Sequence, residues 1–562
     1  METTTKEVCR IIVNVLLAQG VRHFVVSPGS RNTPLLVALA RRKEAVKYVV
    51  VDERSAAFTA LGLTQQLNEP VGIVCTSGTA LLNYAPAVAE AYYQKLPLIV
   101  ISADRPKEWI DQDDSQTIRQ FEALSQFVKK SYDLPSRCDD ATARWYANRI
   151  VNDAVAEATS GRRAPVHINV QLDEPLSLVE NVGEESARRI DIIEPSPTLS
   201  PRVVAQLAAA ANGRKVLVVA GFLQPDERLQ AALHRLAGKS NVAVLTETIS
   251  NLHSERFIPA IDRTLLAMGK DSAPFVPDVL ITIGGALISR IVKAFMRKQH
   301  PAEHWHVGIT DTTVDCMQAL TRRIMTDPAV FFEAFASSLE EGGCRYHDVL
   351  GELAARGMER HEARLAAAPW SDMRAFSRII PSIPKDYHLQ LSNGTTIRYA
   401  QLFGDGVTMR NDCNRGVSGI DGSTSTAVGA SLAYDGVTLL ITGDMSFSYD
   451  LPGLGNGLAD SRLKIIVMQN GGGGIFRFIK STSELPELEE YFEVHRDVPV
   501  KRYAEAFDFA YFEAADEAQL EAVLPAFYAE RERKAILAVK TDNVQSATTL
   551  QDYFSRKKDN KQ

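Results

Sequence analysis

The stretch Val437-Thr-Leu-Leu-Ile-Thr-Gly-Asp444 begins as an apolar run rich in β-branched residues and ends at a glycine followed by an acid. Further along the chain, Leu463-Lys-Ile-Ile-Val-Met-Gln469 repeats the pattern and ends in Asn470-Gly-Gly-Gly-Gly474. Each run predicts a buried strand, and the segment between them is long enough to form a helix. Such a unit places both strand ends side by side at the edge of a parallel sheet, where open α/β sheets bind ligands.

The polar residues at these two strand ends have the chemistry of a divalent cation site. Hard cations such as Mg²⁺ prefer carboxylate, amide and carbonyl oxygens, and they recruit phosphate oxygens to complete their shell. Asp444, Asn470 and the carbonyl of Gly472 supply such oxygens. The glycines let the backbone approach a phosphate, and a helix beginning beyond Gly443 offers free N–H groups to it. Taken singly, Asp444 also fits a helix N-cap and the glycines a flexible turn. Together they predict an enzyme that binds a diphosphate-bearing cofactor.

The same alternation of short apolar runs and helical segments extends along the whole chain. It predicts an α/β protein with three doubly wound parallel-sheet domains, at residues 1–180, 198–340 and 370–562. A segment rich in proline and serine, residues 194–201, predicts a linker, and the charged residues 346–368 predict a connecting helix. Predicted strands are residues 24–26, 48–51, 71–75, 98–102, 166–170, 215–221, 278–285, 388–391, 437–442, 463–469 and 535–540.

Composition narrows the class of protein. The 562 residues are 45% hydrophobic and 23% charged, and the net charge of −7 disfavours nucleic acid as a partner. The six cysteines lack metal-ligand spacing, so we expect reduced thiols in the cytoplasm. The first twenty residues suit an amphipathic helix better than a signal peptide, and no apolar run approaches the roughly 20 residues of a membrane span.

The segment from Gly443-Asp444 to Asn470 resembles the signature of thiamin-diphosphate (ThDP) enzymes, in which Gly-Asp opens the motif and Asn closes it. The resemblance implies a fold of the ThDP-dependent decarboxylase/carboligase type. Residues 1–180 would then bind the pyrimidine of the cofactor and residues 370–562 its diphosphate. Asp444, Asn470 and Gly472 would bind Mg²⁺ or Mn²⁺. The implied cofactor-binding residues at this end are Gly443, Asp444, Met445, Ser446, Asn470, Gly472, Gly473, Ile475 and Phe476.

Two further residues match functional positions of ThDP enzymes. Glu53 follows a predicted strand and corresponds to the catalytic glutamate that touches the aminopyrimidine ring; its alternative is an exposed carboxylate at a strand end. Because shielding from water suits a carboxylate to proton transfer, we expect Glu53 to be buried. Ile420 corresponds to the bulky apolar residue beneath the bent cofactor, although a core side chain in a glycine-rich loop is the alternative.

A narrower resemblance is to the synthases of 2-succinyl-5-enolpyruvyl-6-hydroxy-3-cyclohexene-1-carboxylate (SEPHCHC), which are transferases of menaquinone biosynthesis. It implies decarboxylation of 2-oxoglutarate on ThDP and conjugate addition of the resulting succinic-semialdehyde carbanion to isochorismate, giving SEPHCHC and CO₂. It also implies a homodimer or a dimer of dimers. The matching motifs are Ser27-Pro-Gly-Ser-Arg-Asn-Thr-Pro-Leu35, Asp52-Glu-Arg54, Thr76-Ser-Gly-Thr-Ala80, Ala103-Asp-Arg-Pro106 and Asn414-Arg-Gly-Val-Ser-Gly-Ile-Asp-Gly422.

Arginines recur in these motifs and near strand ends, where they suit dicarboxylate substrates because a guanidinium binds a carboxylate with two parallel hydrogen bonds. For a lone arginine a surface charge or structural ion pair is the alternative. Two positions depart from the family pattern: Gly394 follows Asn393 where serine is common, and Arg290 replaces a common lysine. The implied substrate-binding residues are Ser30, Arg31, Arg105, Gln116, Arg290, Arg398 and Arg415.

Three other functions fit parts of the sequence pattern. Another ThDP carboligase or 2-oxoacid decarboxylase, of the acetolactate-synthase type, is the nearest, but the arginines disfavour a small uncharged acceptor. An NAD-dependent dehydrogenase is disfavoured because no GxGxxG follows an early strand. A non-catalytic relative is disfavoured by the presence of Glu53, Asp444 and Asn470 together.

Overall fold

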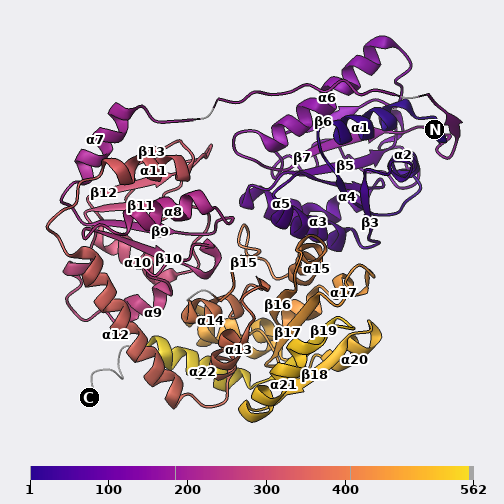
Figure 1. The fold of residues 1–562 in the computed structure, drawn as a ribbon. Coiled ribbons are helices and arrows are strands. Elements are labelled where there is room, and N and C mark those ends of the chain that lie inside the picture. The colour runs from indigo at the N-terminus through magenta and orange to yellow at the C-terminus, as the bar shows by residue number, and fades with distance from the viewer. Residues whose placement is uncertain (1, 184, 196, 405–406, 556–562) are drawn as a thin grey trace. The chain divides into compact units, whose positions relative to one another are not determined.

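The computed structural model describes residues 2–183, 185–195, 197–404 and 407–555, and the chain forms two compact units. Unit 1 comprises Met1–Glu194, Asn414–Asp435 and Tyr449–Leu463, and unit 2 comprises Pro195–Cys413, Gly436–Ser448 and Lys464–Gln562. Three parallel sheets with helices on their faces make up the architecture (Figure 1). The predicted α/β class with three parallel-sheet domains is confirmed, while the predicted domain boundaries stay a prediction.

Unit 1 contains a six-stranded sheet of order β3-β2-β4-β5-β7-β6. Alternate side chains face opposite cores: Phe24 and Val26 pack with α1, α2 and α6, whereas Val25 packs with α3, α4 and α5. A short strand β1 (Glu2–Thr4) pairs antiparallel with β8 (Val179–Asn181). The strands are β2 (His23–Val26), β3 (Val46–Val49), β4 (Val71–Cys75), β5 (Leu98–Asp104), β6 (Ser131–Leu134) and β7 (Val166–Gln171), and the helices are α1 (Glu7–Ala18), α2 (Thr33–Ala40), α3 (Glu53–Leu67), α4 (Thr79–Asn83), α5 (Ala85–Gln94) and α6 (Ala141–Thr159).

Unit 2 contains two sheets, the first of order β10-β9-β11-β12-β13. One face of this sheet is covered by α7, α8 and α11, and the other face is covered by α9, α10 and α12. Residues 346–367 form the long helix α12, as predicted. The strands are β9 (Val216–Ala220), β10 (Val242–Thr246), β11 (Val279–Ile283), β12 (Glu303–Val307) and β13 (Arg322–Ile324), and the helices are α7 (Pro201–Ala211), α8 (Glu227–Leu236), α9 (Ile261–Leu266), α10 (Arg290–Gln299), α11 (Pro328–Ser338) and α12 (Tyr346–Ala367).

The second sheet of unit 2 has the order β15-β14-β16-β17-β19-β18, which repeats the strand order of the sheet in unit 1. The first and last parts of the chain therefore share one sheet topology. Its strands are β14 (His388–Leu391), β15 (Arg410–Cys413), β16 (Thr438–Gly443), β17 (Leu463–Gln469), β18 (Ala510–Ala514) and β19 (Ala535–Lys540). The accompanying helices include α13 (Asp372–Ser382), α14 (Thr396–Phe403), α16 (Asp444–Tyr449), α18 (Gly474–Phe478), α20 (Val500–Ala506), α21 (Glu517–Ala529) and α22 (Asn543–Phe554).

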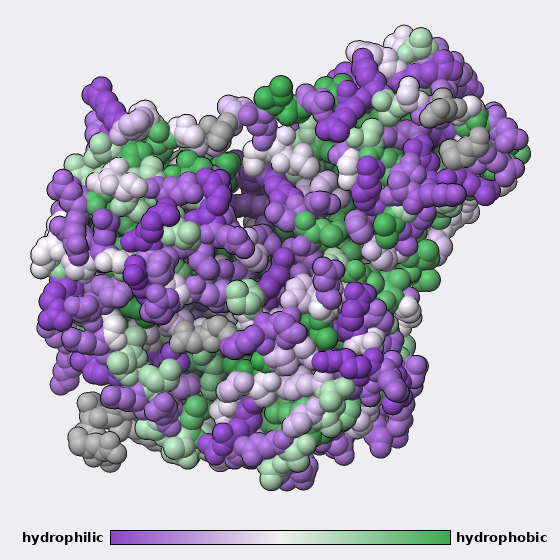
Figure 2. Space-filling model, in the orientation of Figure 1, coloured by the Kyte–Doolittle hydropathy of each residue, from purple (hydrophilic) through white to green (hydrophobic). Residues whose placement is uncertain are grey.

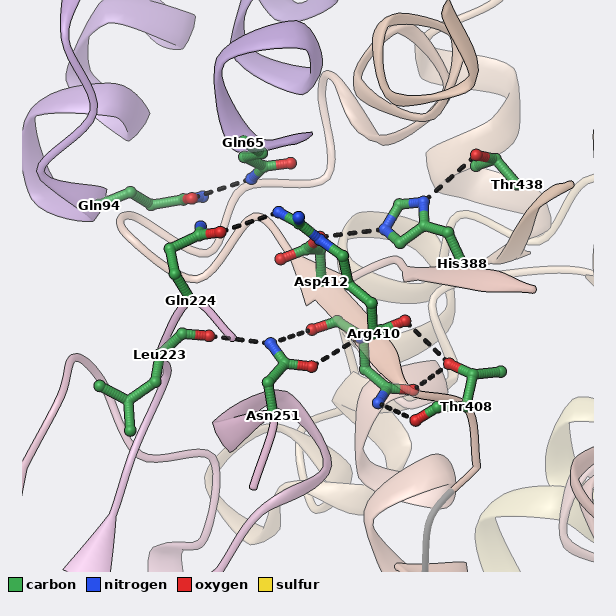
Figure 3. Close-up of polar contacts among 11 residues, drawn as sticks. Gln65, Gln94, Leu223, Gln224, Asn251, His388, Thr408, Arg410, Asp412 and Thr438 are labelled. Atoms are coloured by element: carbon green, nitrogen blue, oxygen red, sulfur yellow. Dashed lines mark hydrogen bonds and ion pairs between the residues drawn. The ribbon is translucent and has the colours of Figure 1, made fainter. Parts of the chain in front are cut away.

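One strand that the sequence analysis missed, β15, has the polar sequence Arg-Asn-Asp-Cys, yet its last three residues are buried. Asp412 accepts from Nε of Arg410 at 3.0 Å and lies 3.0 Å from Nε2 of His388 on β14 (Figure 3). Burial would raise the pKa of Asp412, but the Arg410 charge and the His388 hydrogen bond lower it below its ordinary value. Ion pairing thus allows a strand with charged side chains to be buried. A search for hydrophobic periodicity cannot detect such a strand.

The surface and the cysteines agree with the composition. Most of the face in Figure 2 is hydrophilic, with smaller hydrophobic patches between. No helix among the described residues has the length and apolar character needed to cross a membrane. All six cysteines are free thiols, as their spacing predicts.

We predict that His167 makes the protein sensitive to acid. His167 on β7 is fully buried, and burial lowers its pKa to about 4, whereas an unfolded histidine titrates near 6.5. Between these values the unfolded state binds more protons, so stability is lost as pH falls from about 6.5 to 4, by up to roughly 3 kcal/mol. In His167→Gln the apparent melting temperature should therefore fall less steeply over this range in thermal scans.

The control is His300→Gln, which removes an exposed histidine and should leave the pH dependence unchanged. An equal slope in His167→Gln and the parent protein would contradict the prediction.

Candidate active site

Asp444 and Asn470 lie at the ends of the neighbouring strands β16 and β17, as the sequence predicts. Asp444 is 1% exposed, and its Oδ2 accepts from the backbone N–H of Gly471 at 2.7 Å. That hydrogen bond joins the two strand ends. Burial raises the pKa of Asp444 to about 7, and although backbone hydrogen bonds oppose the rise, the charge of Asp372 adds to it. A cation beside Asp444 would stabilise its ionised form.

Asp372, the first residue of α13, fixes the orientation of Asn470 and was missed by the sequence analysis. Its Oδ2 accepts from Nδ2 of Asn470 at 2.9 Å, and its Oδ1 accepts from Oγ1 of Thr541 at 2.5 Å. Because the Asn470 amide nitrogen is held by Asp372, its amide oxygen, which accepts from the N–H of Gly472 at 3.3 Å, keeps a second lone pair for a cation. Asp372 stands far from the Gly-Asp motif in sequence, so only the fold brings it to the site.

The glycine loop after β17 is held by a second segment that the sequence analysis also missed. The N–H of Gly473 donates to the carbonyl of Glu493 at 2.9 Å, and the N–H of Arg496 donates to the carbonyl of Gly471 at 3.0 Å. The Glu493 side chain is buried and accepts from Nδ2 of Asn543 at 2.6 Å. These contacts give the loop one defined path beside Asp444.

The donor set of this edge fits a divalent cation that also binds a diphosphate. Asp444 offers a carboxylate, Asn470 an amide oxygen and Gly472 a carbonyl with two lone pairs, one of which accepts from Gly474 at 2.9 Å. Among the described residues no three His, Cys, Asp or Glu side chains gather as a metal site. A half-shell of this kind needs phosphate oxygens to complete it, which is the usual binding of Mg²⁺.

The other predicted cofactor residues of unit 2 lie on the same edge. Gly443 ends β16, and Met445 and Ser446 follow Asp444 on α16. Gly473 precedes α18, on which Ile475 and Phe476 are half-buried. The structure therefore brings the whole predicted set of unit 2 to two adjacent strand ends.

Glu53 begins α3 in unit 1, where the N-cap Asp52 accepts from the N–H of Ser55 at 2.8 Å. Its carboxylate lies near Cys75 and Tyr84, since its charge contributes, after burial, to the raised pKa of both. The predicted burial of Glu53 is wrong for the chain as described, because its exposure is intermediate. Glu53 lies in the first turn of α3 at the edge of the sheet, where other parts of unit 1 do not cover it fully.

Helix α3 packs closely against α15 (Ser423–Ala433), which follows the loop containing Arg415 and Ile420. Both helices belong to unit 1. A Cβ added at Gly429 would lie 1.9 Å from the carbonyl oxygen of Thr59, so only glycine permits this approach. Arg415 and Ile420 are both half-buried. The contact links the helix that begins at Glu53 to the segment that contains these two residues.

Two predicted substrate residues, Arg31 and Arg105, lie near each other in unit 1. Arg31 is 5% exposed, and burial together with the Arg105 charge lowers its pKa, against a counteracting effect of Glu174. Arg31 lies 3.2 Å from Glu174, and Arg105 lies 2.9 Å from Asp114. Two guanidinium groups near each other, each with one carboxylate partner, have the charge that suits a polyanion.

Ser30 and Gln116 complete the predicted substrate residues on the first sheet. Ser30 is exposed in the loop after β2. Gln116 is tied to the loop after β4, because its Nε2 donates to the carbonyl of Ser77 at 2.6 Å and the Ser77 hydroxyl donates to the carbonyl of Gln116 at 2.8 Å. Together with Glu53, Arg31 and Arg105, they follow the carboxyl ends of parallel strands.

Arg290 and Arg398 both belong to unit 2, and the charge of Arg398 acts on the buried Asp262. Arg290 is exposed at the start of α10, directly after Ser289, whose hydroxyl donates to Asp262. Burial raises the pKa of Asp262, whereas the Ser289 hydrogen bond and the Arg398 charge oppose the rise. Arg398 also donates to the carbonyl of Gly394, the position that departs from the family pattern. The predicted substrate residues are thus divided between the two units.

Comparison with known proteins identifies relatives across almost the whole chain. Residues 6–123 match the family model described as the thiamine pyrophosphate enzyme, N-terminal TPP binding domain. The chain is 42% identical over 555 residues to the 2-succinyl-5-enolpyruvyl-6-hydroxy-3-cyclohexene-1-carboxylate synthase of Porphyromonas gingivalis, covering 97% of this chain and 96% of the relative. It is 38% identical to the synthase of that name from Flavobacterium psychrophilum, covering 97% of each, and 37% identical to that of Bacteroides fragilis, covering 97% and 98%.

Proposed function

The chain belongs to the family of ThDP-dependent SEPHCHC synthases, enzymes of menaquinone biosynthesis, and on this premise we propose its substrates, its metal and the roles of its residues. The substrates are 2-oxoglutarate, which loses CO₂, and isochorismate, which accepts the remaining four-carbon unit by conjugate addition to give SEPHCHC. The observation that supports this most directly is the pair of arginines, Arg31 and Arg105, held together near the edge of the first sheet. Both substrates are dicarboxylates, and a guanidinium pair neutralises such charge.

The cofactor-binding roles follow from the two strand ends of unit 2. Residues 370–562 are proposed to bind the diphosphate and residues 1–180 the pyrimidine, with residues 198–340 between them. Asp444, Asn470 and the carbonyl of Gly472 hold Mg²⁺ or Mn²⁺, and the metal binds the diphosphate. Asp372 keeps the Asn470 amide oxygen turned toward the metal. Ile420 would support the cofactor from below, and Ile475 and Phe476 would contact it.

ThDP, when bound, supplies a nucleophilic carbon and an electron sink for decarboxylation. Glu53 would hydrogen-bond N1′ of the aminopyrimidine ring and would hold a proton at that atom. Ser30, Arg31, Arg105, Gln116, Arg290, Arg398 and Arg415 bind and orient the substrates, and their guanidinium groups stay fixed while charge moves between the reacting carbons.

We also propose that the protein acts in the cytoplasm as a homodimer or a dimer of dimers. Glu53 lies in unit 1 and Asp444 in unit 2, and in the family resemblance these two parts come from different subunits to form each site. The intermediate exposure of Glu53 in the single chain is consistent with cover from a second subunit.

The metal assignment is tested by Asp444→Ala. Removing the buried carboxylate should weaken ThDP binding at least about tenfold, roughly 1.4 kcal/mol, and should make it insensitive to Mg²⁺ in calorimetric titrations. The control is Asp460→Ala, which removes a carboxylate from a side chain that is half exposed. Unchanged ThDP affinity with normal Mg²⁺ dependence in Asp444→Ala would refute the assignment.

The catalytic role of Glu53 is tested by Glu53→Gln. The amide cannot hold a proton at N1′ as the carboxyl group does, so turnover should fall by about 10²- to 10⁴-fold while metal-dependent ThDP binding is kept. Glu44→Gln, at a more exposed carboxylate of the same unit, is the matched control. Full turnover in Glu53→Gln would exclude the role.

The reaction is tested by incubating the protein with ThDP, Mg²⁺, 2-oxoglutarate and isochorismate and following the loss of isochorismate. We expect the loss to require all four components. If pyruvate replaces 2-oxoglutarate freely, the substrate proposal is wrong and a carboligase of the acetolactate-synthase type is favoured.

A further inference from the structure

We propose that Glu90 is a positioning residue that holds the loop of Arg415 and Ile420 in place and thereby sets how tightly Arg415 binds substrate. The proposal deepens the proposed function and rests on it. Glu90 lies on α5, a helix that the sequence analysis left without a role.

The Glu90 side chain is 2% exposed and binds the loop through backbone amides. Its Oε1 accepts from the N–H of Gly416 at 2.6 Å and its Oε2 from the N–H of Val417 at 2.7 Å. The N–H of Ser418 also helps to lower the pKa of Glu90. Successive amides that converge on one carboxylate fix the backbone directly after Arg415.

A relay of amide side chains holds Glu90 itself. Nε2 of Gln94 donates to Oε1 of Glu90. Oε1 of Gln94 in turn accepts from Nε2 of Gln65 at 2.9 Å (Figure 3). All the partners named for Glu90 donate, so the group accepts through both oxygens, as an ionised carboxylate does. Burial raises the pKa of Glu90, and these donors oppose the rise. Gln65 lies on α3, the helix that begins at Glu53.

The loop backbone rests directly on α5. A Cβ added at Gly416 would lie 2.6 Å from the carbonyl oxygen of Glu90 and 3.1 Å from Cβ of Tyr93, so no other residue permits this approach. Ser418 has a φ of +72°, which the amide contacts stabilise. Close packing and convergent hydrogen bonds thus define one conformation for the segment between Arg415 and Ile420.

The chemistry explains why a carboxylate is needed at position 90. A glutamine there has the same shape but only one acceptor oxygen, and its NH₂ group faces an amide that also donates. The loop then loses at least one hydrogen bond and gains a donor–donor contact. Arg415 should sample more orientations and bind a substrate carboxylate less tightly, whereas the residues proposed to bind the metal keep their own contacts.

The test compares Glu90→Gln, Arg415→Ala and the double variant with the parent protein, and uses Glu69→Gln, an exposed glutamate of unit 1, as the control. In Glu90→Gln the backbone amides of residues 416–418 should exchange with deuterium at least about tenfold faster. KM should rise about tenfold for the same substrate whose KM rises in Arg415→Ala, with a smaller change in kcat. The double variant should have the KM of Arg415→Ala alone, because Glu90 acts through Arg415.

Two results would overturn the proposal directly. Unchanged amide exchange in Glu90→Gln would show that the carboxylate does not hold the loop. Faster exchange with additive effects on KM in the double variant would show a structural role that does not pass through Arg415. If Arg415→Ala itself leaves both KM values unchanged, the substrate role of Arg415 fails and this inference fails with it. Amide exchange, which needs no substrate, separates that outcome from a failure of the loop contact.

Discussion

A carboxylate buried at the end of β16 is the constraint on which the candidate site depends. Asp444 is almost inaccessible to water, and its hydrogen bond to the Gly471 amide joins β16 to the glycine loop after β17. A second buried acid, Asp372, adds negative charge and turns the Asn470 side chain. Two carboxylates that are shielded from water favour the binding of a cation between the strand ends. Because the protein supplies only part of the coordination shell, such a cation favours the binding of a diphosphate.

Both units contain a sheet of the same topology, but the two sheets carry different functional groups. The sheet of unit 1 and the second sheet of unit 2 share a strand order, and each places its functional residues after the carboxyl ends of its strands. In unit 2 these include the oxygen donors for a cation, whereas in unit 1 they are Glu53, Arg31 and Arg105. The tight packing of α3 against α15 and the anchoring of residues 416–418 by Glu90 keep the second set rigid. Such rigidity matters because charges that are already oriented lower the activation barrier of the reaction without having to reorganise during it.

Much of this was predictable from sequence because the informative residues follow apolar strands. Asp444, Asn470 and the glycines stand directly after runs whose periodicity is clear, and the strands β16 and β17 form where predicted. Asp372, Glu90 and Glu493 were not predicted, since each is a single acid without a motif and reaches its partners only through tertiary contacts. β15 was missed because a buried ion pair replaces apolar burial. The predicted burial of Glu53 was wrong because local pattern does not reveal which surfaces a unit leaves uncovered.

The most direct test of the proposed cation site at Asp444, Asn470 and Gly472 is a crystal structure of the protein with ThDP and Mn²⁺. The data would be collected to record anomalous scattering from manganese. We expect one manganese peak within about 2.5 Å of three protein oxygens: a carboxylate oxygen of Asp444, the amide oxygen of Asn470 and the carbonyl oxygen of Gly472. Diphosphate oxygens should complete the coordination shell. A manganese peak elsewhere, or a diphosphate bound away from the ends of β16 and β17, would contradict this expectation.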